Sequence, residues 1–498
     1  MSCALEVRRR DLSPALNDGV RASPFRSFET ARWLANAVLY SFLVVACGGG
    51  QEVPAPPYAL PGDTDKTFAN DGTYVYPRAP FPYGVNTHQI LVISGGRLLA
   101  LGGMGAPPSD GASFQSSASF ALTSSGAMDG TFGQEGLLPA APATAGAQEF
   151  VTAQQLRDGS LVLASKIHTC GPVGSCAMDD PGPTYRVQRY LSTGKLDASY
   201  AQAGTFTTPS HAGNAAILTD GTTISLGATY YRTFISGLSR PFSFHAVVVD
   251  ATGQPDSALA DRFLAQMIRC SPSGTADVSS APGRTTPVVQ RAPDDRIIFA
   301  FGSCMLKLNR DATPDSSFGV NGLSNVDNAG LPVRQILILQ DGTILAFSVR
   351  ADGKSYQVVK RLPNGSPDPA FGAGGVLASL ALPFTLVTGP NYPLVDVPNT
   401  RGFPALDRSG RFLIAGRGGY LARLDAGLNL DTSFGSAGSG VTALGSAGQG
   451  TFEPATIAVD EMNRIILGGS VRTGTGSQYS TYYAEAVTRL YGEQVAGR

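Results

Sequence analysis

The stretch TPDSSFGVNG, from Thr313 to Gly322, decides the fold because the chain repeats it. The related stretches GAMDGTFGQEG, GSPDPAFGAGG and GLNLDTSFGSAG share the pattern D-x-x-[FY]-[GA]-x-x-G with it. A degenerate copy of the repeat begins at Asp256, where Leu259 replaces the aromatic residue. The copies begin at positions 65, 129, 197, 256, 315, 368 and 431. Such regular self-similarity predicts one large repeat domain rather than several unrelated ones.

A second marker alternates with the first. Each unit contains a two-residue turn followed by an apolar run, and Asp-Gly in that setting predicts a β-hairpin with a type I′ turn, since both central residues then need positive φ. The seven copies are GGRLLAL at Gly95, DGSLVLA at Asp158, DGTTISL at Asp220, DDRIIFAF at Asp294, DGTILAF at Asp341, SGRFLIAG at Ser409 and MNRIILGG at Met462.

One unit, residues 374–427, contains four short runs of strand type, GGVLASL, FPALDRSG, RFLIAGR and GYLARLDAG. No segment with a helical period competes with strands after residue 60. Four strands in each of seven units predict an all-β fold, a seven-bladed β-propeller of four-stranded antiparallel blades. The last unit supplies only three strands, so the N-terminal strand Thr73–Tyr76 is predicted to complete that blade and close the ring.

The stretch LARLDAGLNLDTSFGSAGSG, from Leu421 to Gly440, resembles the bacterial delta-60 repeat family. The resemblance covers residues 61 to about 490. It implies a propeller fold and says little about activity, because the function of that family is undefined.

Each repeat supplies an aspartate and an aromatic residue with distinct structural roles. The carboxylate is expected to accept amide hydrogen bonds within its own turn, and the ring to be buried between neighbouring blades. A calcium site is the functional alternative, but one carboxylate per motif is too few for an ion that takes six to eight oxygens. The residues in question are Asp65, Phe68, Asp129, Phe132, Asp197, Tyr200, Asp315, Phe318, Asp368, Phe371, Asp431 and Phe434.

The N-terminal segment has the sequence features of an export signal. Six arginines precede or flank WLANAVLYSFLVVA, an uncharged run of 14 residues that is too short for a standard membrane span. Val44-Val45-Ala46-Cys47 resembles the lipobox of bacterial lipoproteins, although leucine is usual where Val44 stands. The resemblance implies a lipid on Cys47 and, with Gly48 following, the outer membrane. A plain signal peptide, leading to secretion, and an uncleaved anchor are the alternatives.

These observations predict the organisation of the chain. Residues 1–46 form a signal peptide, 47–60 a flexible tether, 61–490 the propeller and 491–498 a tail. Cys3 would be removed and Cys47 lipidated, which leaves Cys170, Cys176, Cys270 and Cys304 for two disulfides in an oxidising compartment. The pairs Cys170–Cys176 and Cys270–Cys304 are expected. A zinc site is a poor alternative, since there is no CxxC pair and the histidines are scattered.

The order of the strands indicates where a ligand would bind. With strands a to d in each blade, the hairpins join a to b and the D-x-x-F-G connectors join c to d, so both lie on one face. The long connections lie on the opposite face, which is therefore the expected binding face. Its candidate recognition residues are Tyr230, Tyr231, Arg232, Phe234, Arg240, Phe242, Tyr392, Tyr479, Tyr482 and Tyr483. These rings could instead simply cover the strand ends.

Composition limits the classes of function. The formal net charge is −1, so there is no surplus of basic residues to bind nucleic acid. No GxSxG or HExxH motif occurs, and four histidines in 498 residues leave little acid–base chemistry near neutral pH. No metal or cofactor is expected.

The sequence predicts a monomeric, exported, lipid-anchored binding or scaffold module for a protein or glycan of the envelope or the extracellular space. The first alternative is a propeller hydrolase or lyase acting on an extracellular polymer, which converging carboxylates in a central funnel would favour. The second is a structural surface protein without a discrete ligand.

Overall fold

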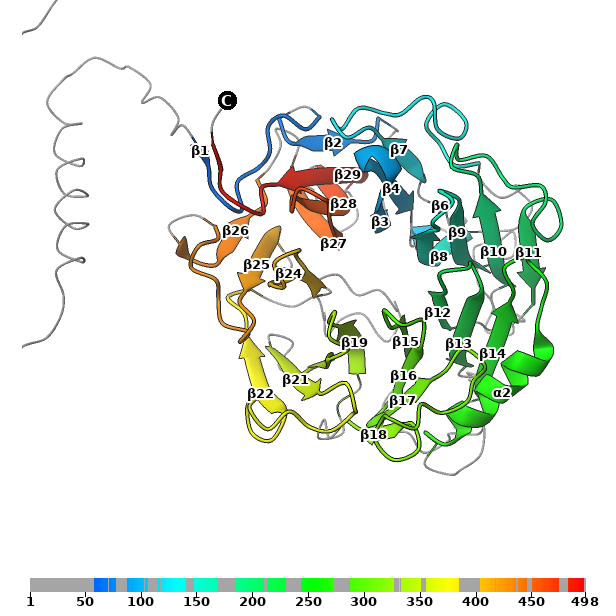
Figure 1. Ribbon diagram of the computed structural model, residues 1–498. Coiled ribbons are helices and arrows are strands. Elements are labelled where there is room, and N and C mark those ends of the chain that lie inside the picture. The colour runs from blue at the N-terminus through cyan, green and yellow to red at the C-terminus, as the bar shows by residue number, and fades with distance from the viewer. Residues whose placement is uncertain are drawn as a thin grey trace, which may run out of the picture. The chain divides into compact units, whose positions relative to one another are not determined.

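Seven small antiparallel sheets form the ring seen in Figure 1, which shows a computed structural model of the chain. The structure describes residues 58–69, 71–77, 87–102, 104–105, 115–116, 118–139, 147–168, 184–209, 213–229, 243–271, 287–326, 331, 333–350, 355–384, 404–416, 418–435, 438–445, 450–473 and 482–496. The described residues confirm the predicted all-β, seven-bladed propeller.

The first four blades follow one another along the chain. Blade 1 contains β3 (Thr87–Ile93), β4 (Arg97–Gly102) and β7 (Phe120–Leu122), and blade 2 contains β8 (Ala147–Gln155), β9 (Leu161–His168), β10 (Thr184–Tyr190) and β11 (Thr205–Thr208). Blade 3 contains β12 (Asn214–Ile217), β13 (Thr223–Thr229) and β14 (Ser243–Val249), and blade 4 contains β15 (Val288–Arg291), β16 (Ile297–Phe301), β17 (Cys304–Leu308) and β18 (Leu323–Asn325).

The last three blades complete the ring. Blade 5 contains β19 (Val333–Ile338), β20 (Ile344–Val349), β21 (Ser355–Arg361) and β22 (Val376–Ala381), and blade 6 contains β23 (Ala405–Leu406), β24 (Phe412–Gly416), β25 (Tyr420–Leu424) and β26 (Val441–Ala443). Blade 7 contains β27 (Thr451–Val459), β28 (Ile465–Thr473), β29 (Tyr482–Leu490) and β2 (Thr73–Val75). A small separate sheet joins β5 (Met104–Gly105) to β6 (Gln115–Ser116).

Strand β2 confirms the predicted closure. It is the outer strand of blade 7 and pairs antiparallel with β29, Tyr74 opposite Val487. A second pairing, between β1 (Tyr58–Ala59) and β30 (Val495–Ala496), lies in the segments predicted to be tether and tail. Both ends of the described chain therefore contribute strands to the closure (Figure 1).

Blade 3 contradicts the expectation of strands alone after residue 60. Helix α2 (Ser257–Ile268) takes the place of its fourth strand and packs against β14. Asp256 is the aspartate of the degenerate repeat copy. Its carboxylate caps the helix by accepting a hydrogen bond from the Leu259 amide at 2.8 Å. Ala260, Phe263 and Met267 are buried, and their helical spacing is the signal that the sequence reading missed.

The hairpins form at all seven predicted places, but the type I′ turn is wrong for six of them. In blade 2, for example, Gly159 has φ +83°, and its amide donates a hydrogen bond to the Leu156 carbonyl at 3.0 Å. The Leu156 amide in turn donates to the Ser160 carbonyl. A single positive φ at the end of a three-residue loop indicates a type I turn followed by a bulge. The same hydrogen bonds recur in blades 3 to 7, where the positive-φ residue is Gly221, Asp295, Gly342, Gly410 or Asn463.

Candidate functional site

The aspartate of each connector has the local role that was predicted. In all six copies its carboxylate accepts a hydrogen bond from the amide two residues later, at 2.9 to 3.1 Å. In five of them it also accepts from the Ser or Thr hydroxyl at that position. The acceptors are Asp65, Asp129, Asp197, Asp315, Asp368 and Asp431. The repeated carboxylate is thus used within its own turn.

The aromatic residue of the connector lies between blades, as expected. Phe132 and Phe318 are fully buried, each in a core cluster that two neighbouring blades share, and Phe68, Tyr200 and Phe434 are buried in the same way. Phe371 differs because it is only half-buried. The residue after the aromatic also links the blades, since the Gly133 amide donates to the Thr193 carbonyl at 2.7 Å.

A basic residue completes the connector, and the sequence reading missed it. Lys307, Lys360 and Arg423 lie eight residues before the connector aspartate, and each makes an ion pair with it at 2.8 to 3.3 Å. The same cations lie over the aromatic rings of Phe318, Phe371 and Phe434, 4.5 to 6.0 Å from the ring centroids. This eight-residue spacing between cation and aspartate was visible in the sequence. Arg189 and Asp197 of blade 2 have the same spacing and also form an ion pair.

The hairpins and connectors lie on one face, as the strand order predicted. Arg189 shows this directly, because its guanidinium contacts Asp158 of a hairpin at 2.8 Å and Asp197 of a connector at 3.3 Å. Lys307 joins Asp294 and Asp315 in the same way, at 3.9 and 3.3 Å. This surface is called the turn face here, and the opposite one the loop face.

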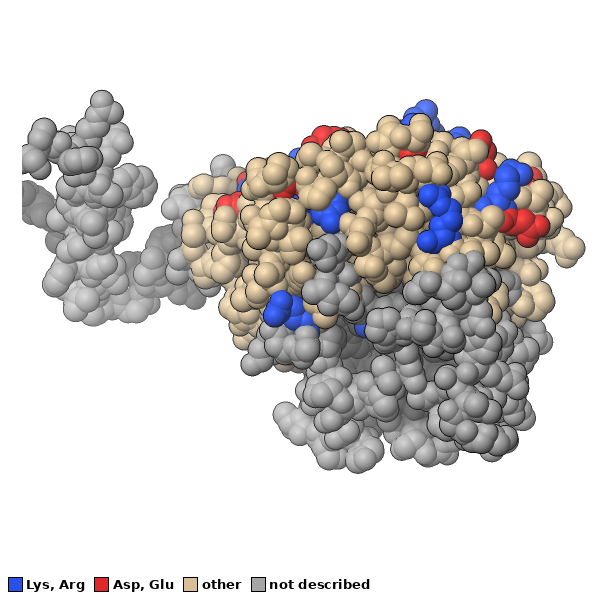
Figure 2. Space-filling model, turned by 90° about the horizontal axis from the view of Figure 1, so that it is seen from below, with Lys and Arg blue, Asp and Glu red and all other residues tan. Residues whose placement is uncertain are grey.

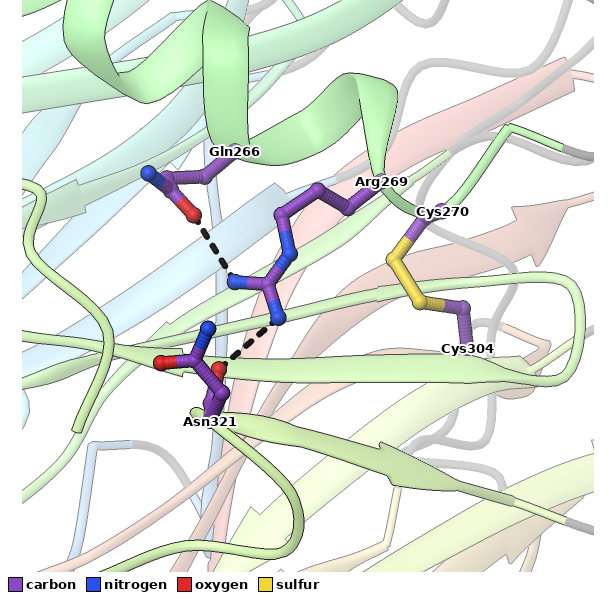
Figure 3. Close-up of a disulfide and its surroundings, with 5 residues drawn as sticks. All are labelled: Gln266, Arg269, Cys270, Cys304 and Asn321. Carbon is purple, nitrogen blue, oxygen red and sulfur yellow. Dashed lines mark hydrogen bonds between the residues drawn. A yellow bond between two sulfur atoms is a disulfide. The ribbon is translucent and has the colours of Figure 1, made fainter. Parts of the chain in front are cut away.

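The predicted disulfide between Cys270 and Cys304 is present, with a Cα–Cα distance of 5.4 Å. It joins the end of α2 in blade 3 to the first residue of β17 in blade 4 (Figure 3). Beside it, Arg269 donates to the Gln266 side chain and to the Asn321 carbonyl, both at 2.8 Å. Blades 3 and 4 are therefore linked covalently and by hydrogen bonds.

Most of the other predicted site residues lie outside the described part of the chain. This holds for Cys47, Cys170 and Cys176, and for the recognition candidates Tyr230, Tyr231, Arg232, Phe234, Arg240, Phe242, Tyr392 and Tyr479. Tyr482 and Tyr483 begin strand β29, but their side chains are not described. The aromatic binding face therefore stays a prediction.

A cavity of about 550 Å³ occupies the centre of the ring, and residues of the first strand in every blade, or next to it, line it. In each sheet this strand is at the edge, so one side of its backbone is unpaired within the sheet. Consecutive residues such as Asn214, Ala215 and Ala216 line the cavity for that reason. The channel consequently offers backbone amide and carbonyl groups as well as side chains.

Five uncharged polar residues line the channel at one level and are called the polar collar here. Each lies four residues before the residue that flanks its hairpin loop. Because this spacing is the same in every blade, the five residues lie at the same level along the channel axis. The collar consists of Gln89, Thr152, Asn214, Gln335 and Thr456, each from a different blade. Val288 is the apolar residue at the same position of blade 4.

The hydrogen bonding of two collar side chains is described by the structure. Asn214 donates to the Pro287 carbonyl of blade 4 at 2.6 Å, so it bridges two blades. The side-chain oxygen of Gln89 is buried and has no hydrogen-bond partner within the described residues. A buried acceptor of this kind calls for a donor from water or a ligand.

Arg334 lies directly beside the collar on the loop-face side. It is the extra residue of a β-bulge in β19, where Val333 pairs with Ser348 and Gln335 pairs with Phe347. Bulges re-aim a side chain, and Arg334 is exposed and lines the channel. No ion pair or hydrogen bond of its guanidinium is found among the described residues.

The other arginine of the channel is neutralised. Arg291 lies at the turn-face end of β15, and its guanidinium contacts the Asp295 carboxylate at 2.9 Å. Burial raises the pKa of Asp295, but hydrogen bonds from Thr219 and Arg291 outweigh this effect and hold the pKa below its usual value. The carboxylate therefore stays charged near neutral pH. Arg291 and Arg334 are the charged residues of the described channel lining.

Two further observations concern metal ions and membrane crossing. The described residues contain no group of three or more His, Cys, Asp or Glu side chains placed to hold a metal ion. Within the same ranges, no helix has the length and apolar character needed to cross a membrane. Figure 2 views the rim, where the described Lys, Arg, Asp and Glu atoms form small separate groups on a mostly uncharged surface.

Comparisons with known proteins show resemblance in fold alone. No protein-family model matches the chain, and no curated protein matches it in sequence. Among solved structures, it is similar to a protein of unknown function from Dyadobacter fermentans, with 11% identity and a TM-score of 0.42 over 84% of this chain and 98% of that one. It is also similar to the polysaccharide lyase Uly1, with 9% identity and a TM-score of 0.37 over 87% and 98%. A third is the PQQ-bound aldose sugar dehydrogenase of Streptomyces coelicolor, with 12% identity and a TM-score of 0.32 over 88% and 100%.

Proposed function

We propose that this protein is an exported, lipid-anchored propeller that serves as a binding module for a glycan or protein of the envelope or the extracellular space. The observation that carries the proposal is the polar collar, in which five blades present amide or hydroxyl groups to one central cavity. Each of these groups can donate or accept a hydrogen bond. The arrangement suits a ligand with many polar groups.

The scaffold around the collar supports precise binding. Each collar residue lies on a strand rather than on a loop, and buried aromatic residues, ion pairs and a disulfide join the surrounding blades. A site on packed strands holds its groups in fixed positions, which lowers the entropic cost of binding. The collar therefore needs little rearrangement to receive a ligand.

The N-terminal sequence supports the cellular location. The charged segment, the short apolar run and Cys47 together favour export and lipid attachment, and the resemblance to the delta-60 repeat family is compatible with a propeller held outside the cytoplasm. With a lipid on Cys47, the propeller would follow a tether that begins at Gly48. The propeller then binds its partner as a monomer attached to the outer membrane.

Glycan-array binding of the full chain tests the proposal. The double variant Thr152→Val/Thr456→Val removes two collar hydroxyls at nearly constant volume and is expected to weaken binding of the selected glycans about tenfold. The matched control Thr432→Val removes an exposed hydroxyl on the turn face and is expected to bind as the unmodified protein does. Equal binding by both variants would show that the collar is not the site.

A further inference from the structure

We propose that Arg334 makes the channel selective for a sugar that carries a carboxylate, such as the uronic-acid end of a glycan. The proposal rests on the proposed function, because it assigns a ligand class to the same cavity. It begins from a contrast within the channel, where Arg291 is paired with Asp295 and Arg334 has no described partner.

The bulge at Arg334 recurs at the equivalent position of blades 1, 2 and 7, and Arg334 lines the channel. In blade 1 the equivalent position, five residues before the residue that flanks the hairpin loop, is His88, whose side chain lies outside the described residues. The same position is Val151 in blade 2, Gly213 in blade 3, Pro287 in blade 4 and Ala455 in blade 7. These residues are small or short, so they leave space at this level. A Cβ on Gly213 would lie 2.2 Å from the Gly227 Cα, so blade 3 has no room for a side chain there. Arg334 thus contributes the one positive charge that the described residues place at this height.

The collar favours a sugar over a peptide. Its polar groups come from five blades and therefore surround the ligand. A sugar ring bears polar groups around its whole circumference and can match them, whereas an extended peptide presents its amides and carbonyls along only two edges. The cavity of about 550 Å³ also falls within the size range of small-molecule sites.

The guanidinium favours a carboxylate as the charged group. Its planar fork can donate two parallel hydrogen bonds to the two carboxylate oxygens, which adds orientation to attraction. Because Arg334 is exposed, salt screens this contact, and the selectivity for acid over neutral sugar should decrease as ionic strength rises.

Titration calorimetry of the full chain with digalacturonate and with its neutral methyl ester tests the assignment. The unmodified protein is expected to bind the acid about tenfold more tightly than the ester at low salt. Arg334→Gln should abolish that difference, because it should weaken binding of the acid about tenfold more than binding of the ester. The matched control Arg157→Gln removes an exposed positive charge from a hairpin on the turn face and should retain the difference.

Each other outcome has a defined meaning. If Arg334→Gln keeps the preference for the acid, Arg334 is not the selector, while a binding loss in Thr152→Val/Thr456→Val would still support the collar. If neither sugar binds, but an acidic peptide does so through Arg334, the sugar assignment is wrong. If the collar variant binds both sugars normally, the proposed site itself fails, which is distinguishable from failure at Arg334 alone.

Discussion

The guanidinium of Arg489, near the C-terminus, lies 4.6 Å from the ring centroid of Phe68, near the N-terminus. Arg489 also contacts the Asp65 carboxylate at 2.8 Å, and both side chains are buried. The same aspartate, cation and aromatic ring recur in blades 4 to 6, where all three come from adjacent parts of the chain. At the closure, the two ends of the chain must meet to assemble the set.

Deleting residues 61–77 should destabilise the whole ring rather than one blade. The deletion removes β2, Phe68 and Asp65 and leaves the buried charge of Arg489 unpaired. The expected loss in the free energy of unfolding is about 5 kcal/mol or more. Calorimetry should show one cooperative transition at a lower Tm, and a chain that begins at Tyr58 is the control. An unchanged Tm in the deletion variant would contradict the closure.

The buried connector rings should stabilise the propeller more than the half-buried one. Phe318→Ala removes a fully buried ring from the interface of blades 4 and 5 and should cost about 3–5 kcal/mol. Phe371→Ala changes the equivalent ring of the next blade, which is only half-buried, and should cost clearly less. Urea unfolding measures both, and equal costs would disprove the packing argument.

The connector carboxylates should make the protein sensitive to acid. Burial raises the pKa of Asp315, but hydrogen bonds from Ser317 and the positive charge of Lys307 outweigh this effect, so the pKa is below its usual value. The pKa of Asp65 and of Asp431 is lowered in a similar way. A lowered folded-state pKa adds stability that is complete above the unfolded-state value of about 3.9 and is lost as the pH falls through the folded-state pKa.

Thermal unfolding across the acid range checks this sign. The Tm should be nearly constant above about pH 5 and fall steeply below about pH 4. Asp315→Asn should flatten that fall because the variant has one fewer carboxylate to protonate. Asp71→Asn, at an exposed position, is the control and should follow the unmodified protein. If Asp315→Asn leaves the slope of Tm against pH unchanged, Asp315 does not contribute to the acid sensitivity.

The disulfide should stabilise blades 3 and 4. Cys270 and Cys304 are 34 residues apart, and closing a loop of that length is worth about 3–4 kcal/mol in the chain-entropy account. The variant Cys270→Ser/Cys304→Ser should lose about that much stability in urea unfolding. Peptide mapping without reductant should recover the Cys270–Cys304 pair, and the predicted Cys170–Cys176 pair as well. Free thiols at Cys170 and Cys176 would refute the second pair.

Mass spectrometry of the mature N-terminus tests the lipid anchor. A bacterial host with lipoprotein processing should release a chain that begins at Cys47 and carries acyl groups. Cys47→Ser should abolish the acyl groups and release the propeller from the membrane fraction, whereas Cys3→Ser is the control and should change nothing. An unmodified Cys47, or cleavage at another position, would show that the lipobox interpretation is wrong.

Local residue patterns were enough to predict much of the architecture. Seven hairpins, seven connectors and a missing fourth strand in the last unit predicted the blade number and the closure by β2. These predictions succeeded because turns depend on a few neighbouring residues, such as the glycine at 159 or the Asp315–Ser317 hydrogen bonds. Membership of the delta-60 repeat family stays a prediction, as do the anchor and the aromatic binding face.

Other features were visible in the sequence but were interpreted wrongly or missed. The spacing of Ala260, Phe263 and Met267 indicated α2. A basic residue stands eight positions before the connector aspartate in blades 2, 4, 5 and 6, and this spacing indicated the ion pairs at Lys307, Lys360 and Arg423. The turn type was wrong because Asp-Gly is compatible with more than one hairpin loop. In six blades the loop has three residues, and only the last of them needs positive φ.

The polar collar and Arg334 depended on the tertiary structure. Gln89, Thr152 and Thr456 are separated by tens to hundreds of residues, and each alone is an ordinary polar residue in a strand. They meet because the first strand of every blade faces the same axis, and Arg334 joins them because a bulge shifts the register of β19. The sequence by itself determined the repeat, since its turns are encoded locally. Only the closed ring decided which side chains share a cavity, because that proximity comes from the arrangement of all seven blades.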